Sequence, residues 1–73
     1  MNNRAKFLFG DIVVVEDNLI GVIVKTWETK GEYYYEVYVR MYNHIVEYDE
    51  QDIERYRVRH KYLDEEELQW QNG

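Results

Sequence analysis

The sequence predicts an all-β domain in which five short strands curl into a small barrel. Three observations lead to this prediction: apolar runs of strand length recur from Phe9 to Tyr48, turn-forming residues separate these runs, and the run 33–42 alternates regularly between two faces. A chain of 73 residues has room for one hydrophobic core. We therefore expect a single domain over 1–73, with the barrel at about 7–62.

The first two strands are predicted from apolar runs rich in β-branched side chains. Residues 11–15 are almost entirely isoleucine and valine, which disfavour helix and fit a pleated strand. A turn at 16–18 leads to a second strand, Leu19 to Trp27. Gly21 within this strand predicts a bulge or a close approach of another backbone. By simple alternation, one face of the strand carries Ile23, Lys25 and Trp27.

The third strand gives the clearest alternation in the chain. After a turn at 29–32, one row is expected to face the core: Tyr33, Tyr35, Val37, Val39 and Met41. The intervening row is expected to face solvent or a partner: Tyr34, Glu36, Tyr38, Arg40 and Tyr42. Asn43 and His44 then predict a two-residue hairpin turn before a short fourth strand, 45–48.

Two acidic stretches late in the sequence predict short helical segments. Asp49 is an N-cap candidate for a single 3-10 turn that ends near Ile53. The fifth strand follows over 55–62. Asp64 is a second N-cap candidate, and it predicts a short C-terminal helix over about 64–71 that docks on the barrel.

The composition excludes several kinds of site. The chain has no cysteine, which excludes disulfides and thiolate zinc sites, and it also lacks serine and proline. Its histidines, His44 and His60, do not have the paired spacing of a zinc site. Because no nucleophile with an activating partner and no cofactor motif is recognisable, we expect no enzymatic activity, no cofactor and no metal.

The charge and the length of the apolar runs bear on location and partners. The formal net charge is −6, which opposes indiscriminate attraction to nucleic-acid phosphates. No apolar run approaches the ~20 residues of a membrane span, and the start of the sequence does not resemble a secretory leader. We therefore expect a cytoplasmic protein without membrane contact.

Three stretches carry a resemblance to a known family: Phe9-Gly10-Asp11-Ile12-Val13-Val14, Gly21-Val22-Ile23-Val24, and the late acidic turn Glu50-Gln51-Asp52-Ile53. Together they resemble the Src-homology-3-like small barrels, especially KOW-type and related short bacterial domains, over roughly residues 7–62. The resemblance implies a module that binds proteins or nucleic acids and does not catalyse a reaction. The loop at 17–19 is acidic and short where KOW motifs carry glycine and basic residues, so the resemblance does not extend to their RNA contact.

We expect a non-enzymatic binding or adaptor module, as a monomer or a homodimer, that recognises another protein through the tyrosine-rich third strand and the basic fifth strand. Outward tyrosine and arginine side chains are favoured at protein interfaces, and the third strand offers four candidate partner-binding residues: Tyr34, Tyr38, Arg40 and Tyr42. The alternative is that these tyrosines pack across the strands against Trp27 and only stiffen the sheet.

A basic row on the predicted fifth strand forms the second candidate set: Arg55, Arg57, Arg59 and Lys61. As a binding site, this row would contact RNA or single-stranded DNA, or an acidic partner. As a purely structural feature, it is a solvated strand face neutralised by nearby acids, or a sheet edge protected by charge. A third interpretation is that the carboxylates of 47–54 and 64–67 mimic a nucleic acid.

Overall fold

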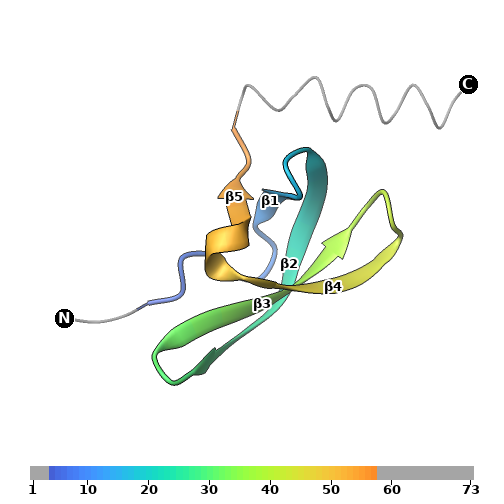
Figure 1. Ribbon diagram of the computed structural model, residues 1–73. Coiled ribbons are helices and arrows are strands. Elements are labelled where there is room, and N and C mark those ends of the chain that lie inside the picture. The colour runs from blue at the N-terminus through green and yellow to red at the C-terminus, as the bar shows by residue number, and fades with distance from the viewer. Residues whose placement is uncertain (1–3, 58–73) are drawn as a thin grey trace, which may run out of the picture.

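The computed structural model describes residues 4–57, which form a single antiparallel sheet and one 3-10 turn (Figure 1). The elements in chain order are β1 (Ile12–Val15), β2 (Leu19–Thr29), β3 (Glu32–Val39), β4 (His44–Asp49), η1 (Glu50–Asp52) and β5 (Ile53–Arg55). The strand order in the sheet is β4-β3-β2-β1-β5, so β2 and β3 lie near its centre and β4 and β5 are its edges.

The all-β prediction and the 3-10 turn before the last strand are confirmed. The barrel is not confirmed, because the described strands form an open sheet in which no pairing joins β4 to β5. Asp49 precedes η1, as expected for an N-cap, but its side chain makes no capping hydrogen bond. The predicted C-terminal helix over 64–71 lies outside the described residues.

The third strand ends earlier than its alternation predicts. β3 ends at Val39, and residues 40–43 form the turn to β4. Asn43 closes this turn with a left-handed backbone (φ 58°), and its N–H donates to the Val39 carbonyl at 2.8 Å. Asparagine tolerates that conformation better than most residues do. Met41 and Tyr42, which the alternation placed on the strand, therefore lie exposed in the turn.

A bulge in β2 changes which side chains share a face. Ile23 pairs with Val37, but the next pair joins Lys25 to Glu36, so Val24 is an extra residue in the ladder. A single inserted residue reverses the alternation on either side of it. The prediction that Ile23 shares a face with Lys25 and Trp27 is therefore wrong.

The core lies on the inner face of the sheet. Of the row predicted to face inward on β3, Tyr35, Val37 and Val39 are fully buried. They form one cluster with side chains from the other strands and from the segment before β1: Phe7, Val13, Val15, Ile23 and Ile53. The Phe7 ring meets the Tyr35 ring edge-to-face, with centroids 5.5 Å apart.

The Tyr35 hydroxyl joins three parts of the chain at one end of the core. It accepts hydrogen bonds from the backbone N–H groups of Lys6 (3.0 Å) and Phe7 (3.3 Å). It donates to the carboxylate of Glu50, which also accepts from the Lys6 N–H at 2.9 Å. Burial, with a smaller effect of the hydrogen bond to Glu50, raises the pKa of Tyr35. This network fixes the segment before β1 to β3 and η1.

Gly21 provides the first test of this packing. A Cβ at residue 21 would lie 2.5 Å from Val37 Cγ1 and 2.9 Å from the Tyr38 carbonyl oxygen. We expect Gly21→Ala to lower the free energy of unfolding by about 1–3 kcal/mol, because the backbone of β3 has to move. Urea denaturation of Gly21→Ala, with the exposed Thr29→Ala as a control on the same strand, measures this cost; equal midpoints for both variants would contradict it.

The Tyr35 hydroxyl provides the second test. Tyr35→Phe keeps the buried ring but removes the acceptor of the Phe7 N–H. We expect a loss of about 1–3 kcal/mol of unfolding free energy, since a buried donor then lacks a partner. Hydrogen exchange at Phe7 should also accelerate more than exchange at Val37 in the centre of β3. Unchanged exchange at Phe7 would show that the hydroxyl does not hold this segment.

Candidate functional site

The sheet face opposite the core, here called the outer face, carries an apolar row that crosses four strands. Direct cross-strand partners lie on the same face of a sheet. The register pairs Ile12 with Val22, Val22 with Tyr38, and Tyr38 with Ile45. The two isoleucines at the ends of this row, Ile12 and Ile45, are 52% and 50% exposed.

Beyond the bulge, the outer face becomes aromatic and acidic. Lys25, Glu36 and Glu47 form one cross-strand row, and Trp27, Tyr34 and Asp49 form the next. The rings of Trp27 and Tyr34 stack at a centroid distance of 6.1 Å and an interplanar angle of 28°. Lys25 Nζ lies 5.8 Å from the Trp27 ring centroid.

Two of the predicted partner-binding residues, Tyr34 and Tyr38, lie on the outer face as expected. Tyr34 is half-buried and stacks on Trp27, so the cross-strand packing expected as the alternative is present as well. The nearby Glu32 carboxylate, more than any other group, raises the pKa of Tyr34. The Tyr38 hydroxyl donates to the side-chain oxygen of Asn43.

The other two, Arg40 and Tyr42, lie in the turn after β3 rather than on the strand. The Arg40 N–H donates to the Ile20 carbonyl at 3.1 Å, which continues the contact with β2 by one residue. The Tyr42 hydroxyl donates to Glu16 of the β1–β2 turn at 2.7 Å. These four residues therefore do not form one continuous row. Tyr38 and Arg40 nevertheless both line a groove on the outer face.

That groove, at the β1 end of the outer face, has a volume of about 250 Å³. Its lining is mainly apolar: Ile12, Ile20, Gly21, Val22, Tyr38, Arg40 and Tyr56. Gly21 is part of this lining, although a Cβ at this residue would lie on the core side of the sheet, against Val37. The groove continues directly into the apolar row that ends at Ile45.

Glu16 joins the β1–β2 turn to the other edge of the sheet. It accepts hydrogen bonds from the hydroxyls of Tyr42 (2.7 Å) and Tyr48 (2.5 Å). These bonds, the one from Tyr48 first, lower the pKa of Glu16. Burial, with the hydrogen bond to Glu16, raises the pKa of Tyr48, and the same carboxylate raises the pKa of Tyr42.

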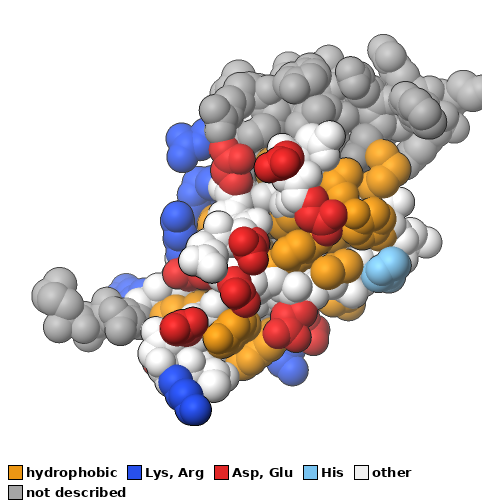
Figure 2. Space-filling model, in the orientation of Figure 1, with side chains coloured by type: hydrophobic (Ala, Val, Ile, Leu, Met, Phe, Trp, Pro, Cys, Tyr) orange, Lys and Arg blue, Asp and Glu red, His pale blue; other side chains and the backbone are white. Residues whose placement is uncertain are grey.

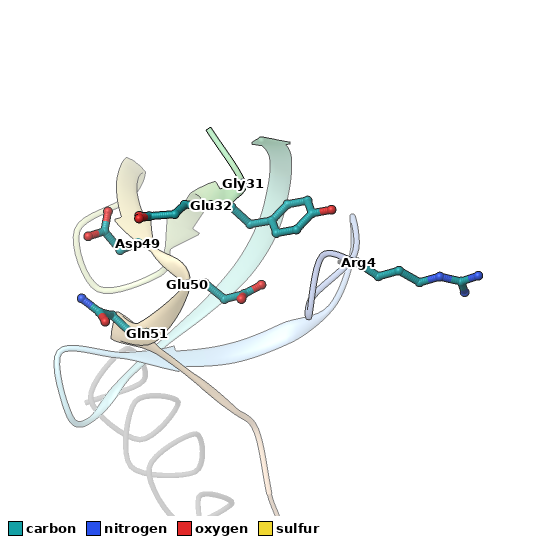
Figure 3. A pocket seen from close by; sticks show the side chains of 7 residues that line it. Arg4, Gly31, Glu32, Asp49, Glu50 and Gln51 are labelled. Carbon is teal, nitrogen blue, oxygen red and sulfur yellow. The ribbon is translucent and has the colours of Figure 1, made fainter. Parts of the chain in front are cut away.

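An acidic hollow of about 540 Å³ lies where the segment before β1 passes η1 and the β2–β3 turn (Figure 3). Carboxylates of Glu32, Asp49 and Glu50 line it, whereas the Arg4 side chain extends away from them. One of the Glu50 oxygens is already bonded to Tyr35 and Lys6. Over residues 4–57, no group of three or more histidine, cysteine, aspartate or glutamate side chains is placed to hold a metal ion.

Of the predicted basic row, the structure describes Arg55 and Arg57. β5 begins at Ile53 and pairs Arg55 with Val13, which puts Arg55 on the core side of the sheet. Its guanidinium donates to the Lys6 carbonyl at 3.1 Å and lies 5.2 Å from the Phe7 ring centroid. Arg57 is described and exposed, while Arg59 and Lys61 lie outside the described residues. Arg55 therefore contacts Phe7 and the segment before β1, and its side chain remains exposed.

Charged side chains are unevenly distributed over the surface. Figure 2 shows acidic side chains spread among hydrophobic ones over one face, with lysine and arginine mainly at its margins.

His44 stacks on Tyr42 at 5.8 Å, and its Nδ1 lies 3.0 Å from the Tyr42 carbonyl oxygen. His60 lies outside the described residues. Within 4–57, no helix has the length and apolar character needed to cross a membrane.

Sequence reasoning did not find the apolar row of the outer face. Ile12 and Ile45 lie at the starts of their strands, where apolar residues are usually assigned to the core. Only the strand register shows that they align with Tyr38. A usable signal was present in Val22, which stands between two buried residues of its strand, Gly21 and Ile23, in a fully apolar run.

Comparisons with protein-family models, with curated proteins and with solved structures each give no match.

The hydrogen bonds to Glu16 predict a pH-dependent stability. A carboxyl whose pKa is lowered by folding stabilises the fold above its ordinary pKa, 4.5, and loses that contribution as the pH falls through the lowered value. We expect Tyr48→Phe to melt at a lower temperature than the unmodified chain at pH 7, and the difference to narrow below pH 4.5.

Tyr38→Phe is the matched control for this measurement. It also removes a tyrosine hydroxyl, but the acceptor is the Asn43 amide, which does not titrate. Its melting difference should stay constant over the same pH range. A Tyr48→Phe difference that is equally constant would contradict the role assigned to Glu16.

Proposed function

We propose that this chain is a non-enzymatic protein-binding module of the Src-homology-3-like class that docks a partner on its outer face. Five antiparallel strands with a 3-10 turn directly before the last one support that class. The close approach at Gly21, one of the stretches that carry the family resemblance, supports it too.

The apolar row Ile12, Val22, Tyr38 and Ile45 is the observation that carries the proposal. In a small domain, contiguous exposed apolar side chains on an otherwise charged surface mark an interaction site. Tyrosine is enriched at the centres of such sites, because its ring contributes a large rigid contact area and its hydroxyl a hydrogen bond. Here Tyr38 lies in the middle of the row, between Val22 and Ile45.

The charge of the outer face specifies the chemistry of the partner. Glu36 lies directly opposite Glu47, and like charges in that position destabilise a sheet. Lys25 opposes Glu36 on the other side and offsets part of this repulsion. A lysine or arginine of a partner would neutralise the remainder, and an apolar side chain beside it would meet Tyr38 and Ile45. We therefore propose a basic protein segment with apolar anchors as the ligand.

Charge-reversal variants of the full chain test this proposal. Glu47→Lys changes the outer face, whereas Glu28→Lys makes the same change on the opposite side of the β2–β3 hairpin, where Glu28 pairs with Tyr33. Partners captured from native cell extract are identified by mass spectrometry for both variants. We expect Glu47→Lys to reduce capture of a basic partner by about tenfold or more, and Glu28→Lys to leave it nearly unchanged.

Each other outcome points to a different function. Equal capture by both variants removes the outer face as the docking surface. Material that disappears after nuclease treatment supports nucleic-acid binding through Arg57, Arg59 and Lys61, and its affinity should fall steeply with salt. Nucleic-acid mimicry by the acidic stretches is supported instead if both variants retain the captured protein and added DNA displaces that protein in competition.

A further inference from the structure

The groove on the outer face has the properties of a binding site for another chain segment. Four of its lining side chains, Ile12, Ile20, Val22 and Tyr38, come from three adjacent strands. Ile20 is only 4% exposed although it does not belong to the core cluster. The groove is therefore a second apolar site, separate from the core on the inner face.

The chain itself arrives at this groove. Tyr56 lines it, and the Tyr56 N–H donates to the Ile12 carbonyl oxygen at a nitrogen–oxygen distance of 3.4 Å. Figure 1 shows β5 beside β1, so the chain leaves the last strand next to the groove. Arg57 is the last described residue, and the segment 58–73 follows it.

The composition of the segment 58–73 matches the lining. It contains large apolar side chains for the groove, namely Tyr62, Leu63, Leu68 and Trp70. It also contains a run of four acidic residues, 64–67, while the lining includes the positive charge of Arg40. Opposite charges at the rim of an apolar contact favour one orientation over another.

We propose that the segment 58–73 occupies the groove of its own chain, with its apolar side chains against Ile12, Val22 and Tyr38 and its acidic run near Arg40. A directly connected segment has an effective concentration of about millimolar, which exceeds that of most free ligands. The segment therefore competes with any partner that needs Tyr38. The occupancy stands without the proposed function, and only the competition rests on it.

Spin labelling of the full chain tests the occupancy. Because the sequence has no cysteine, Gln71→Cys gives a single position for a nitroxide. In the amide NMR spectrum, the label should strongly weaken the signals of Ile12, Gly21 and Val22. The signal of Gly31 should keep its intensity, since it lies roughly 30 Å further along β2 by strand geometry.

Two variants distinguish specific binding of the segment 58–73 in the groove from its non-specific proximity to the sheet. In the spin-labelled chain, Leu68→Asp should restore the intensity of the Ile12, Gly21 and Val22 signals, because a carboxylate replaces a side chain that makes an apolar contact. Gln69→Asp makes the same charge change at the neighbouring residue and should leave the weakening in place. Retained amide shifts of β3 in both variants show that the sheet is intact. Uniform weakening, or equal behaviour of the two variants, would overturn the proposal.

The remaining outcomes also decide. If an isotope-labelled chain without the nitroxide loses its groove signals on mixing with spin-labelled chain, the occupant comes from a second copy, and the intramolecular proposal fails. If Leu68→Asp frees the groove but captures no more partner than the unmodified chain, the occupancy stands and the competition fails. Loss of capture by Glu47→Lys is independent of both results, so the proposed function is tested separately.

Discussion

The pairing of β2 with β3 across the bulge at Val24 is the constraint on which the other features of this domain depend. Before the bulge, Ile23 packs into the core beside Val37; after it, Lys25 and Trp27 face outward. A shift of one residue in this register would exchange the two faces over half of the sheet. The core contact, the Trp27–Tyr34 stack and the groove around Gly21 are thus consequences of one ladder.

Tyrosine hydroxyls bonded to carboxylates stabilise the regions that this small core does not reach. Tyr35 and Glu50 hold the segment before β1 at one end of the sheet. Tyr42 and Tyr48 converge on Glu16 and join the β1–β2 turn to β4. A domain of this size has little apolar area to bury, so such bonds contribute a larger share of its stability than in a large protein.

Local patterns predicted the parts of the fold that local energetics decide. Alternation identified Tyr35, Val37 and Val39 as core residues, and the acidic stretch before Ile53 identified the 3-10 turn. The bulge and the early end of β3 depend on how neighbouring strands pair, which alternation within one strand does not encode. For the same reason, alternation did not show that Arg55 contacts Phe7, and it placed Tyr38 outward without showing its apolar neighbours.

The edge position of β4 gives the outer carboxylates a role in solubility, in addition to the recognition proposed for them. An edge strand has unpaired backbone groups on one side and is a template for sheet growth between molecules. Glu47 and Asp49 alternate outward along this edge, where matching strands of two copies would bring identical charges together. Removing both charges at once would therefore be expected to turn a discrete small protein into a precursor of fibrils.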